Sequence, residues 1–225
     1  TGFNENLAVG SQIPCALGVY EMFVNGEERQ KITAQLEEKL TTYYRDIDSL
    51  KTEGEKVRFI HDLVLAMATP MEDTSESATY GGTIYDTLLL GKALCEGYAE
   101  TFQLLANGAG ISTLYVGAMA SQAYPGTYVS HAWNMVYVNG SWYVVDTMMD
   151  DPVNGDGSYY YEGYLRSAAN HEHMPWVDSW HEPLPEATID SGSTRYIAGT
   201  PQVAKGFTSV PVISVENVAG NNVVT

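Results

Sequence analysis

Cysteine and basic side chains are scarce in this sequence of 225 residues. Its two cysteines, Cys15 and Cys95, are too few for a disulfide-rich scaffold, and no CxxC pair predicts a zinc site. A disulfide between them is compatible with a secreted protein. The sequence has 11 Lys and Arg and 28 Asp and Glu, so its formal net charge is −17. This charge argues against nucleic acid and anionic membrane surfaces as partners. Apolar runs of about 18 residues are absent, so we expect no membrane insertion.

The remaining composition is that of a folded domain. Hydrophobic residues make up 44% and charged residues 17%, which provides enough apolar surface for a packed core. We expect a main domain over residues 27–182, an N-terminal extension over 1–26, and a C-terminal extended segment or linker over 183–225, with a candidate strand at 210–215. The acidic, Tyr-rich and Lys-poor composition favours an extracellular or cell-surface protein.

Two amphipathic helices are predicted near the start of the main domain. Apolar residues recur at helical spacing over 27–48 and again over 53–68, and Pro70 ends the second helix. These helices predict an N-terminal helical layer that packs on the rest of the domain. The long connection over 71–93 leads to Cys95, and connections of this length are usually functional or locally folded.

Cys95 opens a third predicted helix, over 95–106, with Asn107 and Gly108 as its stop. A thiol at a helix start feels the positive end of the helix dipole, which favours the thiolate. The competing interpretation is a small buried hydrophobic residue, which is what free cysteines usually are.

The second half of the domain is predicted to be mostly β. Residues 111–119 indicate a strand, and 121–127 a polar loop. Aromatic and β-branched residues over 130–138 and 141–147 are typical of a hairpin, because an Asn-Gly pair separates them. Residues 162–170 are a candidate short helix.

The two-residue turn at 139–140 predicts which side chains share a face of the hairpin. Extending the register outward from the turn groups His131, Trp133, Asp146 and Met148. Asp146 is then the diagonal neighbour of His131, within reach of a carboxylate–imidazole hydrogen bond. A bulge or another loop length would move Asp146 to the opposite face.

A nucleophile, a base and an orienting carboxylate therefore follow one another as Cys95, His131 and Asp146. A single strand histidine is usually structural, but a carboxylate that borders the apolar run 142–145 is costly unless it is paired. Together the three residues predict cysteine-dependent acyl transfer.

The sequence blocks around these residues resemble the bacterial transglutaminase-like domains over roughly residues 27–175. The stretches that carry the resemblance are GKALCEGYA at 91–99, SHAWN at 130–134, GSWYVVD at 140–146, Asp150-Asp151-Pro152, EKVRFIHD at 55–62 and residues 85–89. The resemblance implies an α+β, papain-like fold with the cysteine helix packed on an antiparallel sheet. It also implies Cys95 as nucleophile, His131 as general base and then acid, and Asp146 as the group that orients the imidazole, with no cofactor and no metal.

The expected reaction is acyl transfer from an amide through a thioester, on protein, peptide or cell-wall peptide. We expect hydrolysis rather than crosslinking, because nothing in the sequence marks an amine-acceptor site. The Cys95 backbone N–H is the natural first oxyanion donor, and Tyr80, Tyr85 and Trp133 are candidates for the second. The alternative is a catalytically silent surface or adhesion module that keeps the fold.

A third hypothesis is a metal-dependent hydrolase. His171, His173 and His181 lie close together in the sequence, but their spacing matches no common zinc motif. His171 also falls near a position at which the resembling family has a structural histidine. The segment 154–158 has a calcium-loop composition but not the EF-hand ligand frame, and we interpret it as a turn.

Overall fold

The computed structural model describes seven stretches of the chain. These are residues 21–71, 81–124, 127–151, 160–171, 184–190, 215–218 and 221–224. Backbone contacts divide the chain into two units, 1–34 and 35–225, which are considered separately. The first unit contains the short helix α1 (Glu21–Val24). The domain boundaries expected after residues 26 and 182 stay predictions.

Both predicted N-terminal helices are confirmed as α2 (Gly26–Asp48) and α3 (Glu53–Met67). Helix α3 begins with a capping box: Thr52 Oγ1 accepts the Glu55 N–H, and the Glu55 carboxylate accepts the Thr52 N–H. The helix ends before Pro70, as predicted. No helix in the described part of the chain is long and apolar enough to cross a membrane.

The described part of the connection to Cys95, residues 81–93, is locally folded. After β1 (Thr69–Pro70), the chain forms a π-helical turn, η1 (Asp86–Leu90), and then β2 (Lys92–Ala93), which pairs with β1 in parallel. Helix α4 (Cys95–Gly108) follows and confirms Cys95 as its first residue. It runs past the predicted stop, because the left-handed residue that permits the turn is Gly110, with φ of 81°.

Three strands form an antiparallel sheet in the order β3–β4–β5. Their bounds are β3 (Thr113–Tyr124), β4 (Thr127–Val138) and β5 (Ser141–Val145). The predicted loop over 121–127 is wrong, because both strands continue through most of it. Two register shifts in the β3–β4 ladder interrupt the period-two pattern that a regular strand would have.

The register of the hairpin next to its turn is confirmed. Val138 pairs with Ser141, and both turn residues are left-handed, with φ of 51° at Asn139 and 85° at Gly140. The ladder ends with the pair of Asn134 and Val145.

The strand pairs predicted farther out, Trp133 with Asp146 and His131 with Met148, are not formed. The Asp146 N–H instead donates to the Gly163 carbonyl at 3.0 Å, so the chain leaves the hairpin at this point. Met148 packs against a cluster that includes Ala132, whose side chain alternates with those of His131 and Trp133 along β4, so the predicted grouping of Met148 with His131 and Trp133 is wrong.

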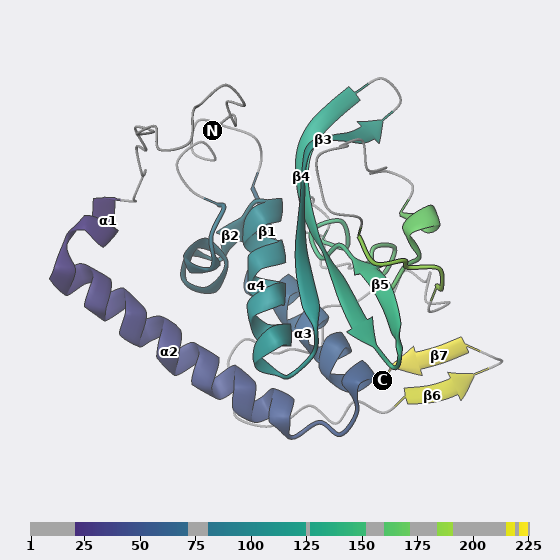
Figure 1. Cartoon of the computed structure of the whole chain (residues 1–225). Helices are drawn as coiled ribbons and strands as arrows, with labels where there is room; N and C mark the ends of the chain where they lie inside the picture. The colour runs from purple at the N-terminus through teal and green to yellow at the C-terminus, as the bar shows by residue number, and fades with distance from the viewer. Residues whose placement is uncertain are drawn as a thin grey trace, which may run out of the picture. The chain divides into compact units, whose positions relative to one another are not determined.

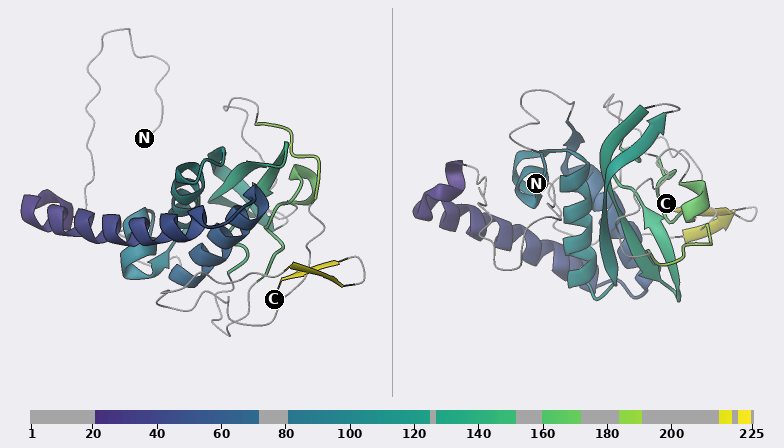
Figure 2. Two further views of the ribbon diagram at one scale, coloured as in Figure 1. Left: turned by 90° about the horizontal axis from the view of Figure 1, so that it is seen from below. Right: turned by 45° about the horizontal axis from the view of Figure 1, so that its top comes forward.

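Helix α4 packs against β3 and β4 on one side and against α3 on another (Figure 1; Figure 2, right). The main core is built from these elements and includes Ile60, Val64, Phe102, Leu105 and Val136. A second cluster joins Val116 and Trp133 to Met135 and Val144. This is the predicted α+β arrangement, with the cysteine helix on an antiparallel sheet.

The chain after β5 is less regular than predicted. Only Ala168–Asn170, a 3-10 turn, is helical in the candidate helix 162–170, because Arg166 forms a bridge with Val144 of β5. A separate hairpin joins β6 (Val215–Val218) and β7 (Asn221–Val224). Most of the candidate strand 210–215 lies outside the described residues.

Gly97, in the first turn of α4, sits where the helix closely approaches the preceding connection. A Cβ atom at this position would lie 2.6 Å from the Gly81 carbonyl oxygen and 3.0 Å from Ala93 Cβ. Both neighbours belong to the backbone or lie directly on it, so they cannot rotate away. The approach therefore requires glycine here and holds the Cys95 end of the helix in place.

We expect Gly97→Ala to lower the free energy of unfolding by about 1 kcal/mol. Overpacking costs about 1–3 kcal/mol and outweighs the gain of about 1 kcal/mol from the better helix propensity of alanine. Urea denaturation measures the change. The control is Glu100→Ala, at an exposed position of the same helix, which should stay within about 0.5 kcal/mol of the parent. A Gly97→Ala protein as stable as this control would contradict the close approach.

Candidate functional site

Asp146 directly follows β5, and its side chain is completely buried. Its Oδ2 atom accepts a hydrogen bond from His131 Nε2 at 2.7 Å, as the sequence predicts. The same oxygen lies 3.1 Å from His171 Nε2, and Oδ1 accepts the Met149 backbone N–H at 3.1 Å. Two imidazoles and one backbone amide thus surround the carboxylate, as burial of a charge requires.

The electrostatics of this pair favour a charged imidazole. Burial disfavours the imidazolium of His131, but the charge and hydrogen bond of Asp146, together with Cys95, raise its pKa to about 10. Burial would raise the pKa of Asp146, yet the interactions with His131 and His171 hold it below its usual range. At neutral pH the pair is therefore an ion pair.

Cys95 is a free thiol, 8% exposed, at the start of α4. Cys15, the disulfide partner considered from the sequence, lies outside the described residues. The Cys95 side chain lies close enough to His131 to contribute, through hydrogen bonding and charge, to the raised pKa of that ring. Since Asp146 occupies Nε2 of that ring, Nδ1 is the nitrogen available to the sulfur. The three predicted residues are brought together.

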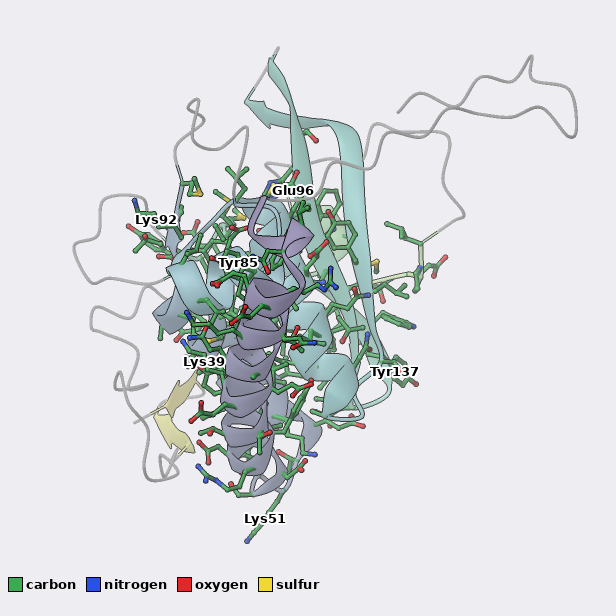
Figure 3. All side chains as sticks on the ribbon, turned by 90° about the vertical axis from the view of Figure 1, so that its left-hand side faces the viewer. Lys39, Lys51, Tyr85, Lys92, Glu96 and Tyr137 are labelled. Atoms are coloured by element: carbon green, nitrogen blue, oxygen red, sulfur yellow. The ribbon has the colours of Figure 1, made fainter. Side chains whose placement is uncertain are left out.

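Acidic groups also lie beside the thiol. Cys95 Sγ donates to Glu96 Oε2 at 3.2 Å. Figure 3 shows Glu96 in the upper part of the view and Lys51 at the bottom. Burial, followed by the charges of Glu96, Cys95 and Glu100, raises the pKa of Tyr115 on β3 to about 12. The surroundings of Cys95 are therefore more negative on the α4 side than on the His131 side.

Trp133 contacts both histidine rings of the site. Its ring stacks on His131 with centroids 5.8 Å apart, and it lies 5.2 Å from the His171 ring. Of the other candidates for a second oxyanion donor, Tyr85 is a half-buried residue just before η1, and Tyr80 lies outside the described residues.

Beneath the site is a second buried ionic group that the sequence analysis missed. His61 is completely buried, with Nδ1 2.9 Å from Asp62 and Nε2 3.0 Å from Asp150. Arg58 Nε donates to Asp62 at 2.9 Å. Burial opposes the charged form of His61, but the two carboxylates outweigh it and raise its pKa. In the sequence, the local signal for this group was the run of charged residues on an otherwise apolar helix. Such a run usually faces solvent, so it did not predict a buried group.

Gly163 connects this group to Asp146. Its N–H donates to Asp150 Oδ1 at 2.8 Å, and its carbonyl accepts the Asp146 N–H at 3.0 Å. A Cβ atom on Gly163 would lie 2.5 Å from the Asp146 carbonyl oxygen, so a side chain cannot fit between the two segments.

His171 is the residue at the site whose contact the sequence did not predict. The metal-ligand hypothesis grouped it with His173 and His181, which lie outside the described residues. The structure places His171 on Asp146 instead. A signal for this contact was the carboxylate itself, since a buried acidic side chain commonly needs more than one donor.

The match to a protein-family model supports the same fold. Residues 41–147 match the family model described as Transglutaminase-like superfamily. No curated protein matches the chain. A solved TGase structure is 20% identical with a TM-score of 0.43, over 57% of this chain and 34% of that one.

Two further solved structures are a candidate cysteine protease from Cytophaga hutchinsonii and a candidate protease from Parabacteroides distasonis. The first is 17% identical with a TM-score of 0.42, over 71% of this chain and 57% of that one. The second is 16% identical with a TM-score of 0.37, over 52% and 28%. This chain thus spans less than two thirds of each of these proteins.

The Asp146–His131 ion pair predicts a pH dependence of stability. The folded-state pKa of His131 lies above its unfolded value of about 6.5, so its contribution is complete below that pH and is lost as pH rises toward 10. Asp146, whose pKa is lowered, contributes above about pH 4 and loses its contribution as pH falls further.

We therefore expect the stability advantage of the parent protein over Asp146→Asn to shrink by about 1–3 kcal/mol between pH 6.5 and 10. Urea denaturation of both proteins at several pH values measures this difference, and groups that titrate alike in both cancel. An advantage that does not change with pH would contradict the ion pair.

Proposed function

We propose that this protein, whose residues 41–147 match the family model described as Transglutaminase-like superfamily, transfers acyl groups from amide bonds through a thioester on Cys95, to water more readily than to an amine. The observation that supports this proposal most directly is the position of His131 between two side chains. Its ring interacts with Asp146 through Nε2 and also with the Cys95 side chain.

In the proposed first step, the Cys95 thiol loses its proton to the Glu96 carboxylate that accepts its hydrogen bond, and the thiolate attacks the carbonyl carbon of the amide. The backbone N–H of Cys95, at the start of α4, donates to the oxyanion that forms. The imidazolium of His131 gives its proton to the leaving nitrogen, the C–N bond breaks, and an amine departs. The acyl group remains on sulfur as a thioester, and Asp146 keeps the ring oriented.

In the second step, His131 accepts a proton from water, and the oxygen attacks the thioester carbon. The C–S bond breaks, the carboxylic acid leaves, and the thiolate–imidazolium pair is restored. A primary amine in place of water would yield a new amide, which is the crosslinking outcome. As substrates we propose protein, peptide or cell-wall peptide, met outside the cell or at its surface.

We expect Cys95→Ala to abolish both peptide cleavage and amine incorporation, because both require the thioester. Incubation with a peptide library and a labelled primary amine, read by mass spectrometry, measures the two products together. Cleavage should exceed incorporation in the parent protein and in Lys51→Ala, an exposed control far from Glu96 (Figure 3). Incorporation without cleavage would refute the preference for water, and activity retained in Cys95→Ala would refute the thioester.

A second expectation concerns the reactivity of the thiol itself. His131→Ala should slow alkylation of Cys95 by iodoacetamide at pH 7 about 10- to 100-fold, because the imidazolium that stabilises the thiolate is gone. Lys51→Ala again serves as control. If the parent protein reacts only at high pH, and His131→Ala reacts equally, Cys95 is an ordinary thiol and the catalytically silent module is the better assignment.

A further inference from the structure

We propose that His171 is a positioning residue of this site, which holds the Asp146 carboxylate so that its Oδ2 atom stays on His131 Nε2. The consequence for catalysis rests on the proposed function above, whereas the positioning itself is a property of the resting protein. His171 lies outside the three residues that the sequence predicts, and it touches neither the sulfur nor a reacting atom.

Three hydrogen bonds hold the Asp146 carboxylate in place. Oδ2 is shared by His131 at 2.7 Å and His171 at 3.1 Å, while Oδ1 is bound by the Met149 N–H at 3.1 Å. The side chain is completely buried, so water cannot replace a missing donor. His171 donates to one carboxylate oxygen and the Met149 N–H to the other, in addition to the bond from His131. Rotation of the carboxylate would break both of these additional bonds, so they fix its plane.

The ring of His171 is itself held in place. It is 5% exposed and packs against Trp133, which also stacks on His131. The backbone just before it is a 3-10 turn whose first residue, Ala168, donates to the Ala187 carbonyl at 2.8 Å. The preceding N–H, of Ser167, donates to Asp190 at 2.7 Å. A side chain anchored in this way can act as a fixed donor.

The path from His171 to the nucleophile is short and passes through Asp146 and His131. Cys95 and Asp146 are the groups that act most directly on His131, the first from α4 and the second from the end of β5. His171 acts on the second of these groups. Its loss should therefore weaken the orientation of His131 without removing any residue that contacts the sulfur.

Two substitutions separate positioning from simple packing. His171→Phe keeps a ring against Trp133 but has no donor, whereas His171→Gln keeps a donor but loses the ring. The first readout is the His131 Nε2–H proton in NMR spectra of the full chain, assigned by its loss in His131→Ala. We expect its exchange with water to be about tenfold faster in His171→Phe and within about twofold of the parent in His171→Gln, because only the donor matters.

The second readout is alkylation of Cys95 by iodoacetamide at pH 7, which should slow about tenfold in His171→Phe and recover in His171→Gln. Unchanged proton exchange in His171→Phe, or faster exchange in His171→Gln than in His171→Phe, would overturn the positioning role. Proton exchange could be faster in His171→Phe but not in His171→Gln, while His131→Ala leaves the alkylation rate of Cys95 unchanged. That pair of results would support the positioning role and refute the proposed catalytic function.

Discussion

The hydrogen bonds that satisfy the buried Asp146 carboxylate hold together segments that are far apart in the sequence. A charge removed from water is tolerated only when donors surround it, and here the donors come from β4, from the turn after β5 and from residue 171. His131 is thereby fixed against the start of α4. Removal of one donor therefore affects the whole site, because the remaining donors cannot compensate across a buried space.

The second ionic group extends the same constraint deeper into the domain. His61 and Asp150 are both buried, and Asp150 holds the Gly163 N–H while the Gly163 carbonyl holds Asp146. The orientation of Asp146 thus depends on α3 as well as on the sheet. Glycine at 163 is required by the close contact between the two segments, since a Cβ atom would overlap the Asp146 backbone. Such networks rigidify a core when every member has its partners.

Local patterns predicted those parts of the fold that depend on neighbours in sequence. The capping box of α3, the start of α4 at Cys95 and the turn at 139–140 are each determined by a few adjacent residues. Predictions failed where the pattern was interrupted. Most of the loop expected over 121–127 is strand, because register shifts hide its period. The pair of His131 with Met148 is not formed, because the chain after β5 turns to Gly163.

By itself, the sequence determined the order of thiol, imidazole and carboxylate and the approach of His131 to Asp146 across a hairpin. Both follow from helix and strand periodicity, which act over a few residues. Only the tertiary structure decided that His171 completes the surroundings of Asp146. It also decided that a charged group beneath the site, joined through Gly163, supports the same carboxylate. These contacts depend on the path of irregular segments, and that path is set by the need to satisfy buried charges rather than by any local period.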